Sequence, residues 1–243
     1  MRNFFTIWSR ELTACFLSPV AYVTMVIFLV VSGGTFAMEV FRGEGSTDPL
    51  PTMLFAAIVV WLTILITVIS MSLFTEEKSS GTMETLMTAP VTEVEVVLGK
   101  YAGALMFLLI VTAPAVGNIF ILNALSSGID TVDMGAVAGG CLVLILVSAL
   151  CMSVGLLISL LSQHQIIAAV SCFSASWFVL MFGQLISALP GGWDKLEGYL
   201  LTLRHIEVFS LGIVDTRPIV LYLSCTTFLL FAAVRVLESR RWS

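Results

Sequence analysis

The sequence predicts an all-α integral membrane protein with six transmembrane helices, and three observations support this fold class. Hydrophobic residues make up 58% of the 243 residues and charged residues only 11%, against about a quarter charged in soluble domains. The mean hydropathy is +1.05. The apolar residues also form six runs, each near the ~20 residues that cross ~30 Å of hydrocarbon. We expect residues 1–243 to form one membrane domain, because no stretch between the runs is long enough to build its own core.

The predicted spans set an orientation. They cover Pro19–Met38, Met53–Phe74, Tyr101–Leu122, Met134–Leu161, Ile166–Leu189 and Pro218–Leu237. An even number of spans places both termini on one side. Of the 11 Lys and Arg residues, seven belong to the N-terminus, to residues 75–100 and to the C-terminal end. The positive-inside rule then predicts that both termini are cytoplasmic. The first run has full spanning length and no cleavage site after it, so we expect a span rather than a signal peptide.

Residues 1–18 are predicted to form an amphipathic elbow helix at the membrane interface. Its apolar side carries Phe4, Trp8, Leu12 and Cys15, and its polar side carries Arg2, Thr6, Ser9, Arg10 and Thr13. A basic helix with aromatic residues is typical of interfacial helices. Its candidate functional residues are Trp8, Arg10, Ser18, Pro19 and Tyr22. A plain interfacial anchor would share the pattern, apart from the detail Ser-Pro-x-Ala-Tyr.

Residues 75–100 form a charged segment between the second and third spans. They hold seven of the 27 charged side chains: Glu76, Glu77, Lys78, Glu84, Glu93, Glu95 and Lys100. Hydrocarbon excludes such a cluster, so the segment is expected in water, attached to the membrane at both ends. Gly81 interrupts the stretch of chain before it. Thr82 can then cap a short helix, and Pro90 ends that helix. Glu84 lies in its first turn, near the positive helix end.

The short helix has one small apolar face. Met83, Leu86 and Met87 fall at positions i, i+3 and i+4. About seven residues do not hold a helix alone in water, so a partner is expected to pack on this face. Thr92 and Glu95 then have the capping-box spacing that starts the next helix. An ordinary polar loop with an amphipathic turn fits the spacing about equally well.

Two other connections have sequence features of their own. Ser162 to Gln165 is a tight turn on the side of the termini. Its His164 is as compatible with an ordinary solvated turn residue as with a functional one.

In the outer connection, residues 190–217, an apolar stripe comprises Leu196, Tyr199, Leu200, Leu203 and Ile206. Arg204, His205 and Glu207 exclude a seventh span, so we expect this piece to lie at the outer interface. Glycines in the fourth span predict close helix packing, and Pro114 in the third predicts a packing feature or a kink.

Several classes of function are disfavoured. The net charge is −5 with no basic stripe, which argues against a nucleic-acid partner. No Gly-x-x-x-x-Gly-Lys-Ser/Thr motif occurs, so we expect no ATP hydrolysis by this chain. The spans carry no ionisable residue away from their ends, which disfavours an ion-coupled transporter. Catalytic, cofactor and metal sites are all expected to be absent: the two histidines lie outside span centres, and the five cysteines lack metal-site spacing.

The charged segment resembles the first cytoplasmic coupling segment of ABC-2 type transporter permeases. The matching positions are Glu77, Gly81-Thr82, Glu84, Leu86, Pro90-Val91 and Gly99-Lys100. Three further stretches resemble the gliding-motility-type branch of that family: Arg10 to Tyr22, His205 to Arg217, and Leu237 to Trp242. The resemblance is spread over the whole chain and fits six spans.

The resemblance implies the permease subunit of an exporter in the inner membrane of a bacterium. Its partners would be a cytoplasmic ABC ATPase subunit carrying ATP and Mg²⁺, a second permease chain, and an accessory extracytoplasmic protein. The implied coupling residues are Glu76, Glu77, Gly81, Thr82, Met83, Glu84, Leu86, Met87, Pro90, Thr92, Glu95, Gly99 and Lys100, with Gln163, His164 and Gln165 as a second coupling turn. The alternative is a membrane module that transmits force or a signal from a partner ATPase without moving a substrate.

Overall fold

The described part of the protein is helical throughout. The computed structural model describes residues 2–42, 50–79, 81, 92–125, 134–187 and 200–241. Its helices are α1 (Arg2–Leu17), α2 (Pro19–Arg42), α3 (Leu50–Ser72), α4 (Thr75–Ser79), α6 (Glu93–Leu125), α7 (Met134–Leu161), α8 (Gln165–Ser187), α10 (Thr202–Ser210) and α11 (Thr216–Arg241). Six are long and apolar enough to cross a membrane, which confirms the predicted fold class and number of spans.

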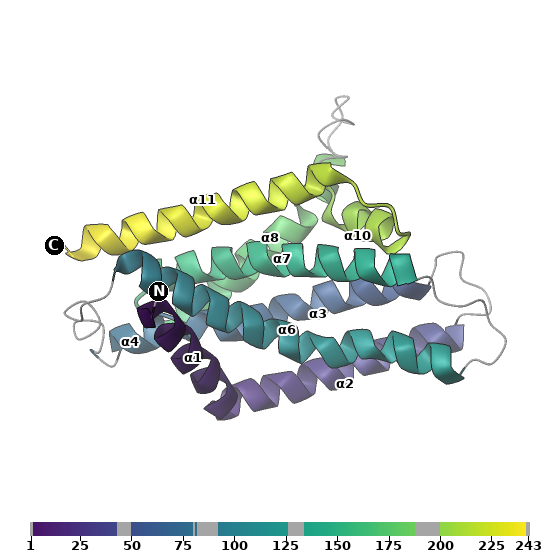
Figure 1. The fold of residues 1–243 in the computed structure, drawn as a ribbon, viewed down its shortest axis with the longest axis horizontal. Helices are drawn as coiled ribbons and strands as arrows, with labels where there is room; N and C mark the ends of the chain where they lie inside the picture. The colour runs from purple at the N-terminus through teal and green to yellow at the C-terminus, as the bar shows by residue number, and fades with distance from the viewer. Residues whose placement is uncertain are drawn as a thin grey trace.

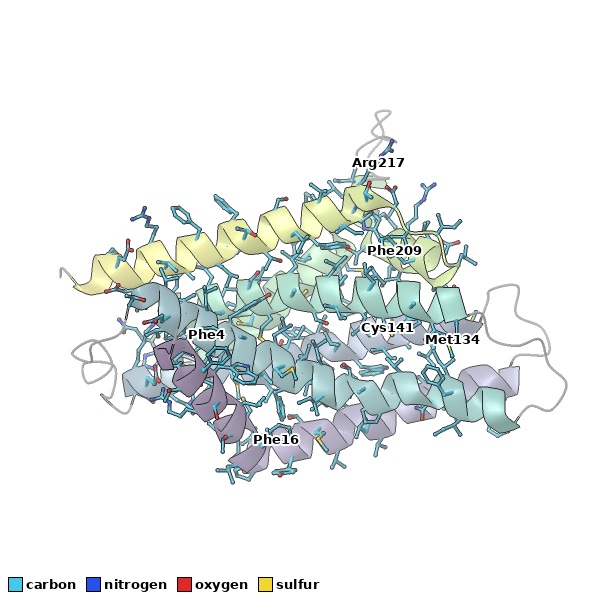
Figure 2. The ribbon with its side chains drawn as sticks, viewed as in Figure 1. Phe4, Phe16, Met134, Cys141, Phe209 and Arg217 are labelled. Atoms are coloured by element: carbon cyan, nitrogen blue, oxygen red, sulfur yellow. The ribbon has the colours of Figure 1, made fainter. Side chains whose placement is uncertain are left out.

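The six long helices form one elongated bundle (Figure 1). Both termini lie at one end of it, together with α4 and the start of α6, as an even number of spans requires. Helices α3 and α7 are the most buried spans, and α2 and α11 are the least. Fully buried apolar side chains such as Phe55, Ile66 and Met152 form the core between them. Figure 2 shows how densely side chains fill the bundle.

Close packing around α7 depends on glycine. A side chain at Gly139 would overlap the backbone carbonyl of Phe209, and one at Gly140 would overlap the Phe55 ring. A side chain at Gly155 would collide with Ser70 of α3. The glycines predicted to allow close approach therefore do so within this chain, since helix α7 meets α3 and α10 at backbone distance.

Helix α10 packs against the bundle at the end opposite to the termini (Figure 1). Its residues Thr202, Ile206 and Phe209 are buried, and the helix contacts α7, α3 and α8. Its position at the outer interface stays a prediction. Two polar contacts hold the helix on the bundle. The Ser210 hydroxyl lies 2.7 Å from that of Thr52, and His205 Nδ1 lies 3.1 Å from the Tyr222 hydroxyl. The predicted stripe residues Leu196 and Tyr199 lie outside the described residues.

Replacing Gly139 by alanine should destabilise the protein by about 1–3 kcal/mol, because the new methyl group must displace the Phe209 backbone. Thermal unfolding in detergent would measure this as a lower midpoint. Gly117→Ala is the matched control, since a Cβ at Gly117 meets no atom within 4 Å. Equal midpoints for the two variants would contradict the close approach of α10 to α7.

Candidate functional site

Charged side chains of α1, α4 and the start of α6 converge at the bundle end that holds both termini (Figure 1). Helix α1 crosses the first turns of α6 there, and the corner between α3 and α4 lies beside them (Figure 1). Residues 162–164, which connect α7 to α8, lie at the same end and contact this corner through Lys78. Segments far apart in sequence thus meet in one region.

Helix α1 packs on α6 through two glycines. A Cβ at Gly99 would lie 2.8 Å from the Ile7 side chain, and one at Gly103 would lie 2.9 Å from the Glu11 side chain. Ile7 is buried by this contact. Further along, the rings of Phe16 and Phe107 meet edge to face at 4.9 Å. The elbow helix is therefore fixed on the bundle, and its inner face is set by Ile7 and Glu11.

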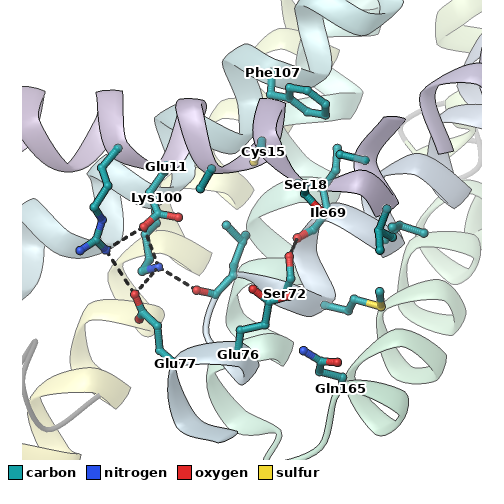
Figure 3. A pocket seen from close by; sticks show the side chains of 17 residues that line it. Glu11, Cys15, Ser18, Ile69, Ser72, Glu76, Glu77, Lys100, Phe107 and Gln165 are labelled. Atoms are coloured by element: carbon teal, nitrogen blue, oxygen red, sulfur yellow. Dashed lines mark hydrogen bonds and ion pairs between the residues drawn. The ribbon is translucent and has the colours of Figure 1, made fainter. Parts of the chain in front are cut away.

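The centre of the site is the buried ammonium group of Lys100, which is 1% exposed. Its Nζ donates to Glu11 Oε1 at 3.0 Å and to the Leu73 carbonyl at 2.8 Å, and it lies 2.9 Å from Glu77 Oε1. The Phe74 ring adds a face 5.1 Å from Nζ. Three oxygen atoms match the three N–H donors of an ammonium group. Figure 3 shows these contacts converging on Lys100 from α1, α4 and the α3–α4 corner.

Arg10 completes what we name the Lys100 cluster: Arg10, Glu11, Glu77 and Lys100. The Arg10 guanidinium lies 2.9 Å from Glu11 and 3.3 Å from Glu77, and its hydrogen bond to Glu11 raises the pKa of the guanidinium. Two cations thus face two carboxylates. Buried charge is tolerated only where it is paired and hydrogen-bonded, so this cluster determines how α1, α4 and α6 fit together.

Helix α4 ends as the sequence predicts. Gly81 has a φ of 71°, a backbone conformation that glycine adopts without strain, and its N–H donates to the Lys78 carbonyl. The capping box of α6 is also confirmed. The Thr92 N–H donates to Glu95 Oε2 and the Glu95 N–H donates to Thr92 Oγ1, both at 3.3 Å. Gly81 therefore follows the end of α4 with a glycine-favoured conformation, and Thr92 caps the first turn of α6.

A cavity of about 380 Å³ lies beside the Lys100 cluster. It is lined by polar groups of the cluster and Glu76, by Cys15 and Ser18 of the elbow, by apolar residues of α2 and α3, and by Gln165 of α8 (Figure 3). Among the described residues, no group of His, Cys, Asp or Glu is arranged to hold a metal ion. The described contacts hold α1, α4 and the start of α6 in a fixed relation.

The structure brings some predicted site residues together and separates others. Arg10, Glu77, Gly99 and Lys100 meet in or beside the cluster, and Glu76, Ser18 and Gln165 line the cavity. Tyr22 points outward, 51% exposed, Pro19 begins α2, and Trp8 is half-buried. Gln163 and His164 lie exposed in the α7–α8 turn. Thr82, Met83, Glu84, Leu86, Met87 and Pro90 lie outside the described residues.

Two residues were missed as site residues, Glu11 and Lys78. Glu11 is the one acidic residue among the first 17, and a lone carboxylate in a basic helix was the available signal. Lys78 was counted with its charged segment, but nothing in the local sequence indicates its partners, which are backbone carbonyls at the end of α7.

Comparison with known proteins identifies the family of the chain. Residues 12–179, more than half of the sequence, match the family model described as ABC-2 family transporter protein. The matched range runs from the middle of α1 to the middle of α8 and so contains Lys100, Glu77 and the α7–α8 turn. No curated protein matches the sequence at a significant level.

Replacing Lys100 by methionine should lower the free energy of unfolding by about 3 kcal/mol, because Glu11 and Glu77 lose their buried cation and keep only the more exposed Arg10. Unfolding in detergent would measure the loss. Adding Glu77→Gln should recover part of it. Arg235→Met, which breaks the exposed Arg235–Glu238 pair, should cost at most about 1 kcal/mol. Similar small losses for both single variants would contradict a stabilising cluster.

Burial raises the pKa of the Cys15 thiol from its ordinary 9.0 to about 11, so its thiolate fraction at pH 8 should be about a hundredfold below that of an exposed cysteine. In a chain whose other four cysteines are replaced by alanine, alkylation of Cys15 should accelerate roughly tenfold per pH unit up to pH 10. Ser79→Cys, at an exposed position of α4, is the control and should level off earlier. A Cys15 rate that levels off near pH 9 would show that the elbow does not cover it.

Proposed function

The chain belongs to the ABC-2 transporter family, and we propose that it couples ATP hydrolysis on a separate ATPase subunit to export of a substrate. Family membership and six apolar helices make it a multi-pass membrane subunit of an ABC transporter. Subunits of this kind generally carry no catalytic site. The finer statement, that this subunit receives force from an ATPase, is supported by the Lys100 cluster.

The observation that carries the proposal is that both ends of the charged segment are fixed to the bundle. At one end Glu77 is bound to Lys100 and Arg10. At the other, the capping box starts α6 eight residues before Lys100 itself. Breaking a buried ion pair by removing a partner costs about 3–5 kcal/mol, so moderate forces move these helices together rather than apart. A push on the segment therefore reaches α3, α6 and α1 at once.

The proposed cycle has three steps. The apolar face of Met83, Leu86 and Met87 docks in a groove of the ATPase subunit, which carries ATP and Mg²⁺. ATP-driven closure of two ATPase subunits displaces the segment, and the corner from Pro90 to Glu95 passes the displacement to α6. Two permease chains then open or close a path between them, as two states whose populations the ATPase shifts through differential affinity.

The setting of this cycle is proposed on sequence grounds. The distribution of Lys and Arg favours cytoplasmic termini, and the bundle end with both termini carries the charged segment (Figure 1). The bacterial inner membrane, the second permease chain, an accessory extracytoplasmic protein and the gliding-motility-type branch rest on the sequence resemblance.

Replacing Leu86 by aspartate should weaken ATPase binding at least tenfold, because a carboxylate in an apolar groove loses its hydration without gaining a counter-charge. Leu86→Met is the control that keeps an apolar side chain. Pull-down of the co-purifying ATPase subunit and the thermal midpoint of the permease would be measured together. Binding should fall while the midpoint stays within the range of a surface change. Unchanged binding and unchanged ATP turnover would exclude Leu86 from the contact.

Reconstituted vesicles test the function itself. The pure chain should show no ATP hydrolysis, the complex should hydrolyse ATP, and cargo identified by mass spectrometry of the purified complex should stimulate turnover and accumulate across the bilayer. Hydrolysis without movement of any co-purified cargo would favour the force-transmitting alternative. Robust turnover by the pure chain would overturn the proposal.

A further inference from the structure

Lys78 reaches across the bundle end to the last turn of α7. Its Nζ donates to the carbonyl oxygens of Ser159, Leu160 and Ser162, at 3.4 Å for Ser159 and 2.8 Å for Ser162. The last carbonyls of a helix have no partner within that helix, and they form the negative end of its dipole. A lysine from α4, about eighty residues earlier in the chain, thus caps α7.

A second contact joins the same two segments. The backbone N–H of Phe74 donates to Ser159 Oγ at 3.1 Å, and both Phe74 and Ser159 are fully buried. The corner between α3 and α4 therefore binds the end of α7 through two groups, the Phe74 backbone N–H and the Lys78 ammonium group. Phe74 also stands beside Lys100, so the Lys78 contacts and the Lys100 cluster share one corner of the chain.

The α7–α8 turn is short and ordered around these contacts. The Ser162 N–H donates to the Ile158 carbonyl at 2.9 Å, and the Ala168 N–H donates to the His164 carbonyl at 3.0 Å. Two residues separate Ser162 from the first residue of α8, Gln165. Because the connecting segment is so short, a displacement of Ser162 also displaces the start of α8.

We propose that Lys78 is the positioning residue that joins α4 to the turn at residues 162–164, so that a movement of α4 also moves this turn and α8. We call this connection the Lys78 joint. Its role in transport rests on the proposed function, but the joint itself does not. The acceptors are backbone carbonyls, which a side-chain substitution does not remove. The interaction therefore depends on two properties of residue 78: a charged N–H donor and a side chain long enough to reach the end of α7. An arginine retains both, whereas a methionine retains only the length.

Amide hydrogen exchange of the chain alone, in lipid nanodiscs, tests the joint. Lys78→Met should raise exchange in peptides covering 158–168 by about tenfold, and Lys78→Arg should restore wild-type protection. Arg235→Met removes the same charge from an exposed pair at the same bundle end and should leave these peptides unchanged. Wild-type protection in Lys78→Met, or equal loss in Lys78→Arg, would overturn the assignment.

The complex with the co-purifying ATPase subunit tests whether the joint transmits movement. In the wild type, addition of a non-hydrolysable ATP analogue should change exchange in both 75–100 and 158–168. In Lys78→Met the first change should remain and the second should be lost. A change that still reaches 158–168 in Lys78→Met would overturn transmission through Lys78. If the ATPase alters neither region in the wild type, the proposed function fails, and the measurement on the chain alone still decides the joint.

Discussion

The ammonium group of Lys100 is the constraint on which one end of this bundle depends. A buried cation needs oxygen acceptors around it, and here they come from three separate places: Glu11 on α1, Glu77 on α4, and the Leu73 carbonyl just beyond the end of α3. Gly99 and Gly103 let α1 come close enough for Glu11 to take part. The break between α3 and α4 leaves Leu73 turned toward Lys100. The end of α3 and the two glycines of α6 thus serve the same purpose: they bring oxygen acceptors to the Lys100 ammonium group.

The two ends of the bundle are held by different interactions. At the end near Arg217 and Phe209 (Figure 2), the described contacts are short-range: glycine against backbone, a hydroxyl–hydroxyl pair and an imidazole–hydroxyl pair. At the other end they are ionic and span several helices. Steric contacts fail when surfaces separate slightly, whereas charges attract over longer distances. The ionic contacts therefore keep α1, α4 and the start of α6 together even where their surfaces are not in close steric contact.

The sequence was informative where signals are local. Hydropathy placed α7 at Met134–Leu161, the bounds observed, but began the third span at Tyr101, eight residues after the observed start of α6. The capping box of Thr92 and Glu95 indicated that earlier start, because it describes backbone rather than burial. Long-range pairs were not predictable: Lys100 and Glu11 are 89 residues apart, and no local pattern sets the register of α1 on α6. The docking face around Leu86 stays a prediction.

The length of α6 has a mechanical consequence. Its 33 residues extend about 50 Å at 1.5 Å per residue, well beyond the ~30 Å of hydrocarbon, and its first turn carries the charged residues Glu93 and Glu95. Pro114 lies inside this helix and lacks the N–H that would bind the carbonyl four residues earlier. Lys100 lies about 21 Å along the axis from that weak point. A tilt of about 5° at Pro114 would move Lys100 by about 2 Å, so a small bend at this proline would be enlarged at the Lys100 cluster.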